Sequence, residues 1–129
     1  MAHRVITADG GTPTTPFAPA ALVAEGRRVL FVSGQLADDL NGELVGGDDA
    51  GAQAEQCFRN IDALLTAAGA TRTDVVKLTI YLTDLADREA VARARTAYFG
   101  VHMPASTGLR IAGLVIPGAR VEVEAIAVF

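Results

Sequence analysis

The chain has 129 residues, of which 50% are hydrophobic and 20% charged, and this size and composition predict one globular domain spanning residues 1–129. Eleven basic against 15 acidic residues give a net charge of −4, which disfavours nucleic acid as a partner. One cysteine and two histidines exclude an internal disulfide and are too few for an ordinary zinc site, so we expect no metal.

The N-terminal part predicts an extended arm followed by a hairpin. The chain shows no signal-peptide core and no long apolar span, which indicates a cytoplasmic protein without a membrane partner. The prolines within residues 12–19 disfavour a helix and predict an extended arm. Short apolar runs at residues 21–24 and 29–33 predict a β-hairpin, and a further short strand is expected at residues 4–7.

Between residues 48 and 69 the apolar side chains recur every three or four positions, which predicts an amphipathic helix. Asp48 or Asp49 is suited to cap its N-terminus, and Gly69 is suited to end it. Cys57 lies on the apolar stripe with no basic residue adjoining it, so we interpret it as core packing rather than as a reactive thiol.

The second half of the chain predicts a strand, a helix and two more strands. Residues 76–83 alternate between apolar and polar, a second helix begins at Asp87, and strands are expected at residues 107–115 and 121–129. Together these elements predict an α+β domain, with a mixed sheet of about six strands and two helices packed on one face. The other face of such a sheet is uncovered, which favours association of subunits.

Two glutamates are the first candidates for chemistry. Glu122 and Glu124 share one side of the last strand with apolar residues, and a carboxylate in such surroundings is a candidate for burial, a raised pKa and general-base catalysis. The alternative is an edge strand with solvated glutamates. His102 is interpreted as a surface residue in a loop. The hydroxyl residues lack a nucleophile-elbow motif, so no hydrolase triad is expected at Ser33, Ser106 or Thr107.

Several motifs in this order resemble the Rid family of reactive-intermediate imine deaminases, also called the YjgF family, over nearly the whole chain. The motifs are Val-Ser-Gly-Gln at 32–35, Gln-Cys-Phe-Arg-Asn-Ile at 56–61, the strand at 75–85, Pro-Ala-Ser-Thr at 104–107 and the final strand at 121–128. The resemblance implies a chorismate-mutase-like fold and a homotrimer with three small-molecule clefts between subunits. It also implies hydrolysis of 2-imino or 2-enamino acids to 2-keto acids and ammonia, without metal or organic cofactor.

The resemblance assigns roles to one wall of the cleft. It places the water-orienting, catalytic glutamate at Glu122. An aromatic residue of the proline-containing arm, commonly tyrosine in the family, falls on Phe17, which keeps the ring and lacks the hydroxyl. The wall that contacts the substrate falls on Ser33, Gly34 and Gln35.

The other wall departs from the family pattern. Where deaminating members carry an arginine that clamps the substrate carboxylate, this chain has Ser106, followed by Thr107, and Gly108 replaces a frequent cysteine. A family asparagine on the second helix falls near Ala92. Arg110 lies on the same side of its strand as Ser106, but four strand residues span about 13 Å, so it reaches that position only through a register slip.

Two functions therefore stay open. The first is a hydrolase acting on an imine or enamine, with water positioned by Glu122. The second is a non-catalytic trimer that binds a metabolite or has a regulatory role, in which Ser106 and Gly108 mark the loss of catalysis. Ribonuclease activity, attached to some relatives, is disfavoured by the acidic balance and the lack of a basic groove.

Overall fold

The computed structural model describes residues 3–8, 21–24 and 28–129, so the arm expected at residues 12–19 lies outside the described residues. The elements in chain order are β1 (His3–Ile6), β2 (Ala21–Ala24), β3 (Val29–Gln35), α1 (Ala50–Ala68), the 3₁₀ turn η1 (Arg72–Asp74), β4 (Val75–Leu82), the 3₁₀ turn η2 (Leu85–Asp87), α2 (Arg88–Phe99), β5 (Ala105–Arg110) and β6 (Val121–Val128).

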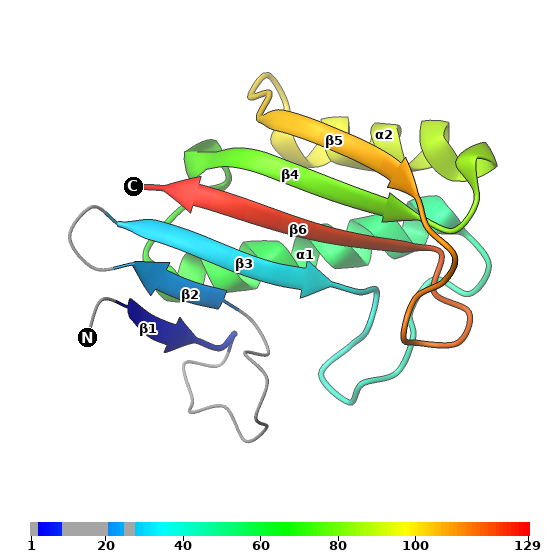
Figure 1. Cartoon of the computed structure of the whole chain (residues 1–129), viewed down its shortest axis with the longest axis horizontal. Helices are drawn as coiled ribbons and strands as arrows, with labels where there is room; N and C mark the ends of the chain where they lie inside the picture. The colour runs from blue at the N-terminus through cyan, green and yellow to red at the C-terminus, as the bar shows by residue number, and fades with distance from the viewer. Residues whose placement is uncertain (1–2, 9–20, 25–27) are drawn as a thin grey trace.

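The strands form one six-stranded sheet in the order β1-β2-β3-β6-β4-β5 (Figure 1). Strands β4 and β5 run parallel and the other neighbours antiparallel, with β2 and β3 forming the expected hairpin. Both helices lie behind the same face of the sheet (Figure 1). The predicted α+β class, with a mixed sheet and two helices on one face, is confirmed.

Helix α1 forms as its apolar period predicts. The Asp49 carboxylate accepts a hydrogen bond from the Ala52 N–H at 3.0 Å, and Gly69 ends the helix in the left-handed region at φ 81°. The apolar stripe, with Phe58 at its centre, is buried among the core side chains of the sheet. Cys57 is fully buried, and this burial raises its pKa to about 12, which confirms its place in the core.

Strand β5 corrects the expectation of a strand at residues 107–115, because it begins at Ala105 and ends at Arg110. It is the edge strand and pairs with β4 alone, in unbroken register. Strand β4 ends at Leu82, whose carbonyl accepts the last hydrogen bond from the Ile111 N–H at 2.8 Å. Beyond that point the chain has no strand to pair with, so it leaves the sheet.

A buried amide side chain ties helix α1 to the segment that enters β6. Gln53 has no exposed surface. Its Nε2 donates to the carbonyls of Gly47 at 2.6 Å and Gly118 at 3.0 Å, and its Oε1 accepts from the Arg120 N–H at 2.8 Å. The Arg120 guanidinium in turn donates to both carboxylate oxygens of Asp87, at 2.9 and 3.2 Å. These bonds fix the start of β6 against α1 and against the turn η2 that leads into α2.

We predict that Gln53→Leu lowers the free energy of unfolding by about 1–3 kcal/mol, because two carbonyls and one N–H lose their partner. Urea denaturation measures this loss. Gln56→Leu is the matched control on the same helix, since its amide is only half-buried and bonds mainly to Asn60. Equal losses in the two variants would contradict the role given to Gln53.

Candidate functional site

The alternation of side chains along β6 separates the core from the candidate glutamates. Val121 and Val123 are fully buried on the side of the helices, whereas Glu122 and Glu124 are half-buried on the other side. Tyr81 of β4 stands in register with Glu122. We call the side of the sheet that bears Glu122, Glu124 and Tyr81 the open face, and the side packed against α1 and α2 the helix face.

Glu122 lies in a hollow of about 600 Å³ on the open face. Its carboxylate closely approaches Gly34 of β3, since a Cβ at Gly34 would overlap the carboxylate oxygen and lie 2.8 Å from the Cδ of Glu122. Glycine at this position therefore leaves room for the carboxylate. The residues that line the hollow are Gly34, Tyr81, Ile111, Gly113, Leu114, Val115, Glu122 and Glu124.

The two glutamates of this hollow have different surroundings. Burial raises the pKa of Glu122 above its ordinary value, and the charge of Glu124 raises it further. The Tyr81 hydroxyl donates to Oε1 of Glu124 at 2.6 Å, and this bond is the main cause that raises the pKa of Tyr81. Glu124 is thus committed to Tyr81, whereas no hydrogen bond reaches the Glu122 carboxylate from a described side chain.

This arrangement suits proton transfer. A carboxylate whose pKa is raised is a stronger base than an ordinary glutamate, and it can hold a water molecule and accept its proton. Tyr81 stays protonated at neutral pH and fixes the neighbouring Glu124. The open-face hollow therefore holds a carboxylate with the chemistry that a general base needs.

Three residues predicted at the other wall of the cleft, Ser106, Gly108 and Ala92, lie together on the helix face. Ser106 pairs with Leu78 and Gly108 with Ile80, two residues that are buried beneath the helices. With Ala92 of α2 they border a hollow of about 330 Å³ between α2 and the edge of the sheet. Its full lining is Ile80, Leu82, Arg88, Glu89, Val91, Ala92, Arg95, Ser106 and Gly108.

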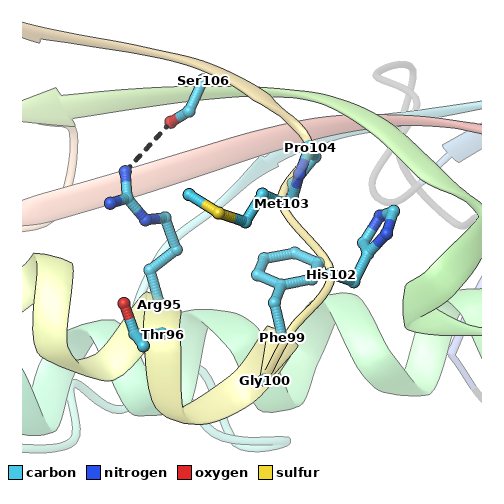
Figure 2. A pocket seen from close by; sticks show the side chains of 8 residues that line it. All are labelled: Arg95, Thr96, Phe99, Gly100, His102, Met103, Pro104 and Ser106. Carbon is cyan, nitrogen blue, oxygen red and sulfur yellow. Dashed lines mark hydrogen bonds between the residues drawn. The ribbon is translucent and has the colours of Figure 1, made fainter.

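Arg95 of α2 reaches across to this strand. Figure 2 shows its guanidinium pointing at Ser106, with NH1 donating to the serine Oγ at 3.4 Å. A third hollow, of about 140 Å³, shares these two residues and extends toward Met103 and His102 (Figure 2). Nε2 of His102 lies 2.7 Å from the carbonyl oxygen of Val75. This contact holds the imidazole against the backbone.

The remaining candidates of β5 separate from one another. Thr107 lies on the open face, where its hydroxyl accepts a hydrogen bond from Nζ of Lys77 at 2.7 Å. Arg110 pairs with Leu82 at the far end of the strand, on the same face as Ser106. Because the register is unbroken, the slip that would bring Arg110 to the Ser106 position does not occur.

The candidates of the N-terminal half also divide. Gln35 donates from Nε2 to the carbonyl of Ser33 at 2.9 Å and lines a fourth hollow, of about 220 Å³, together with Asp38 and Asn60. Phe17 lies outside the described residues. The proposed wall consisted of Ser33, Gly34 and Gln35. Of these three, Gly34 is the one among the described lining residues of the hollow that holds Glu122.

A single chain does not bring Glu122 and Ser106 into one site, because they lie on opposite faces of the sheet. Sequence reasoning also missed Tyr81 and Arg95. The sequence did contain a signal for Tyr81, since this residue occupies a polar position of a strand that alternates between apolar and polar residues. Arg88, Ala92 and Arg95 follow the spacing of one helix face, but that spacing did not indicate which strand the face covers.

Within the described ranges, no group of three or more His, Cys, Asp or Glu side chains is arranged to hold a metal ion. None of the helices in that part of the chain is long and apolar enough to cross a membrane.

Comparisons with known proteins agree with one another. The family model described as Endoribonuclease L-PSP matches residues 11–129. The 2-iminobutanoate/2-iminopropanoate deaminases of goat (Capra hircus) and human (Homo sapiens) are 39% and 36% identical to this chain, and each alignment covers 99% of this chain and 91% of the relative.

Solved structures give the same result. The Rid-family protein YyfA of Yersinia pestis, described as a protein of unknown function, is 33% identical with a TM-score of 0.87, covering 99% of this chain and 100% of that one. The YjgF gene product of E. coli is 31% identical with a TM-score of 0.81, covering 96% of each chain. The fold, the order of motifs and these relatives lead to one conclusion: the chain belongs to the Rid family, for which the names YjgF, RutC and L-PSP are also in use.

Proposed function

We propose that this protein hydrolyses a reactive imine or enamine to a carbonyl compound and ammonia, with a water molecule positioned by Glu122. The observation that carries the proposal is the half-buried Glu122 carboxylate against Gly34, with its pKa raised by burial and by Glu124. The relatives named 2-iminobutanoate/2-iminopropanoate deaminase support the same reaction class. No cofactor is needed for it.

The reaction balances with one water and one base. The water oxygen bonds to the imine carbon, the π electrons move to nitrogen, and one water proton passes through Glu122 to that nitrogen. In the second step the carbon–nitrogen bond breaks with its electrons on nitrogen, and the hydroxyl proton passes through Glu122 to the leaving ammonia. The remaining carbon–oxygen pair closes as a carbonyl.

The proposed working unit is a homotrimer of chorismate-mutase-like subunits with clefts between them. Glu122 and Ser106 lie on opposite faces of one sheet, so a cleft that uses both needs two copies of the chain. The open face also exposes apolar side chains, with Phe31 47%, Leu109 38% and Val128 37% accessible. Covering this face with a second copy removes that apolar surface from water.

A non-catalytic metabolite-binding or regulatory trimer is the alternative, and it is favoured by Ser106 and Gly108, which supply no cation from β5. We do not propose ribonuclease activity, although the family model carries that description, because the net charge of −4 opposes binding of a polyanion.

The first prediction concerns turnover. The protein should accelerate ammonia release from 2-iminopropanoate or 2-iminobutanoate generated in place by an amino-acid oxidase, and Glu122→Gln should lower kcat by roughly 10²- to 10⁴-fold, the usual worth of a general base. Glu55→Gln, on the exposed surface of α1, is the control and should keep full activity. Unchanged turnover in Glu122→Gln would contradict the role of Glu122 as general base. If the native chain does not accelerate ammonia release, the alternative of a non-catalytic binding protein is favoured.

The second prediction concerns pH. Activity requires ionised Glu122, so the rate should fall as the pH drops through the pKa of Glu122. This acid limb of the pH–rate profile should lie at a higher pH than that of an ordinary glutamate. Glu124→Gln removes the neighbouring negative charge and keeps an oxygen that can accept from Tyr81. The acid limb of kcat/KM should therefore move to lower pH in Glu124→Gln and stay in place in Glu55→Gln. A limb that moves upward or does not move would contradict the coupling of the two glutamates.

The third prediction concerns assembly. Sedimentation should give the mass of a trimer, and Phe31→Glu should weaken association by at least roughly tenfold, since it places a charge on the apolar open face. Leu40→Glu, in an exposed turn, is the control and should leave the mass unchanged. A monomer in the native protein, or a Phe31→Glu trimer of native affinity, would exclude the open face as the interface.

A further inference from the structure

The hollow on the helix face is distinct from the hollow that holds Glu122. It lies between α2 and the β4–β5 edge and has a volume of about 330 Å³, enough for a small organic molecule. One side is apolar, formed by Ile80, Leu82, Val91 and Ala92. The small residues Ala92 and Gly108 leave its floor open, and nothing lies within 4 Å of the position that a Cβ at Gly108 would take.

The polar side of this hollow carries more positive than negative charge. Arg88 and Arg95 face it from α2, together with one carboxylate, Glu89. Arg88 and Glu89 are exposed in the first turn of the helix, whereas Arg95 is half-buried two turns further on, next to Ser106. Arg95 is therefore the cation nearest to the enclosed part of the hollow.

Arg95 has a polar neighbour but no local counter-charge. Its only hydrogen bond to a described residue is the long one to Ser106 Oγ, at 3.4 Å. The ion pairs among the described residues are Arg59 with Glu55 and Arg120 with Asp87, so no carboxylate of a described residue lies within 4.0 Å of the Arg95 guanidinium. Arg120 differs from Arg95 in this respect, because its guanidinium donates two hydrogen bonds to the carboxylate of Asp87.

We propose that Arg95 and Ser106 bind the carboxylate of a short-chain 2-oxo or 2-imino acid in the helix-face hollow. A guanidinium presents two parallel N–H donors that match the two oxygens of a carboxylate, and the serine hydroxyl adds a third donor beside them. The apolar wall of Ile80 and Val91 then accommodates a short hydrocarbon side chain. The choice of an imino acid as substrate rests on the proposed function, whereas the binding of the carboxylate does not.

Other arginines of this region do not satisfy the same conditions. Arg110 lies four residues from Ser106 along an unbroken strand, about 13 Å away. Arg93 lies on the exposed side of α2 and does not line the hollow. These two residues provide matched controls for Arg95.

The test measures binding of pyruvate and 2-oxobutanoate, which are stable oxo acids, by isothermal titration calorimetry on the full chain. The native protein should bind both, and Arg95→Ala should weaken binding by roughly 10- to 100-fold, as expected for the loss of a charge-assisted hydrogen-bond pair. Arg95→Lys should lose less, because it keeps the charge and loses the paired geometry. Arg93→Ala and Arg110→Ala should bind as the native protein does.

A rescue experiment separates a lost ligand contact from a disturbed fold. Ser106→Arg combined with Arg95→Ala returns a guanidinium to the same hollow from the opposite wall, and it should recover most of the lost affinity. Butanone, which lacks the carboxylate, should not distinguish the native protein from Arg95→Ala.

Each outcome decides a different claim. Native affinity in Arg95→Ala, an equal loss in Arg110→Ala, or no binding of either oxo acid by the native protein would overturn this inference. Binding that depends on Arg95 without any ammonia release from imines would support the inference and reject the proposed deaminase. Ammonia release with oxo-acid binding that ignores Arg95 would do the reverse.

Discussion

The alternation of side chains along β6 is the constraint on which the rest of the molecule depends. This strand lies between β3 and β4, and its valines and alanines fill the core beneath the helices. The same geometry turns Glu122 and Glu124 to the opposite side. A shift of one residue would bury two carboxylates and expose the core side chains of the strand, so packing energy itself specifies the position of the candidate base. The bonds from Gln53 and Arg120 reinforce this register at the point where β6 begins.

Elements whose pattern depends on local chemistry could be predicted closely. Helix α1 is predicted by its apolar stripe, by Asp49 as its N-cap and by Gly69 at its end, and all three act as expected. The end of β5 could not be predicted, since it is set by the last residue of a partner strand, Leu82, and not by the sequence of β5. In the site, Glu122 could be predicted from the alternation of side chains along the last strand. The contact between Arg95 and Ser106 could not, because it joins two elements whose relative placement no local pattern encodes.

Under the proposed function, the division of the candidate residues between two faces would link catalysis to assembly. Glu122 and Gly34 border one hollow, and Ser106 and Gly108 border another on the far side of the sheet. A ligand that contacts both sets must lie where the edge of one copy meets the open face of another. Mutations that weaken association would then reduce activity without touching either hollow, because the base and the carboxylate-binding pair would come from different chains.

The origin of the proposed cation also affects which ligands the hollow accepts. An arginine on β5 would project from the edge of the sheet, whereas Arg95 projects from α2 and approaches Ser106 from the side of the helix (Figure 2). The carboxylate would be drawn toward the helix, and the space over Gly108 would stay free for the remainder of the ligand. A chain that carries glycine and serine on the strand, and its arginine on the helix, therefore offers more room at the sheet edge while keeping one positive charge in the hollow. In that position the hydrocarbon side chain of a short-chain acid would lie against Ile80 and Val91 and not against water, and its burial would add to the affinity.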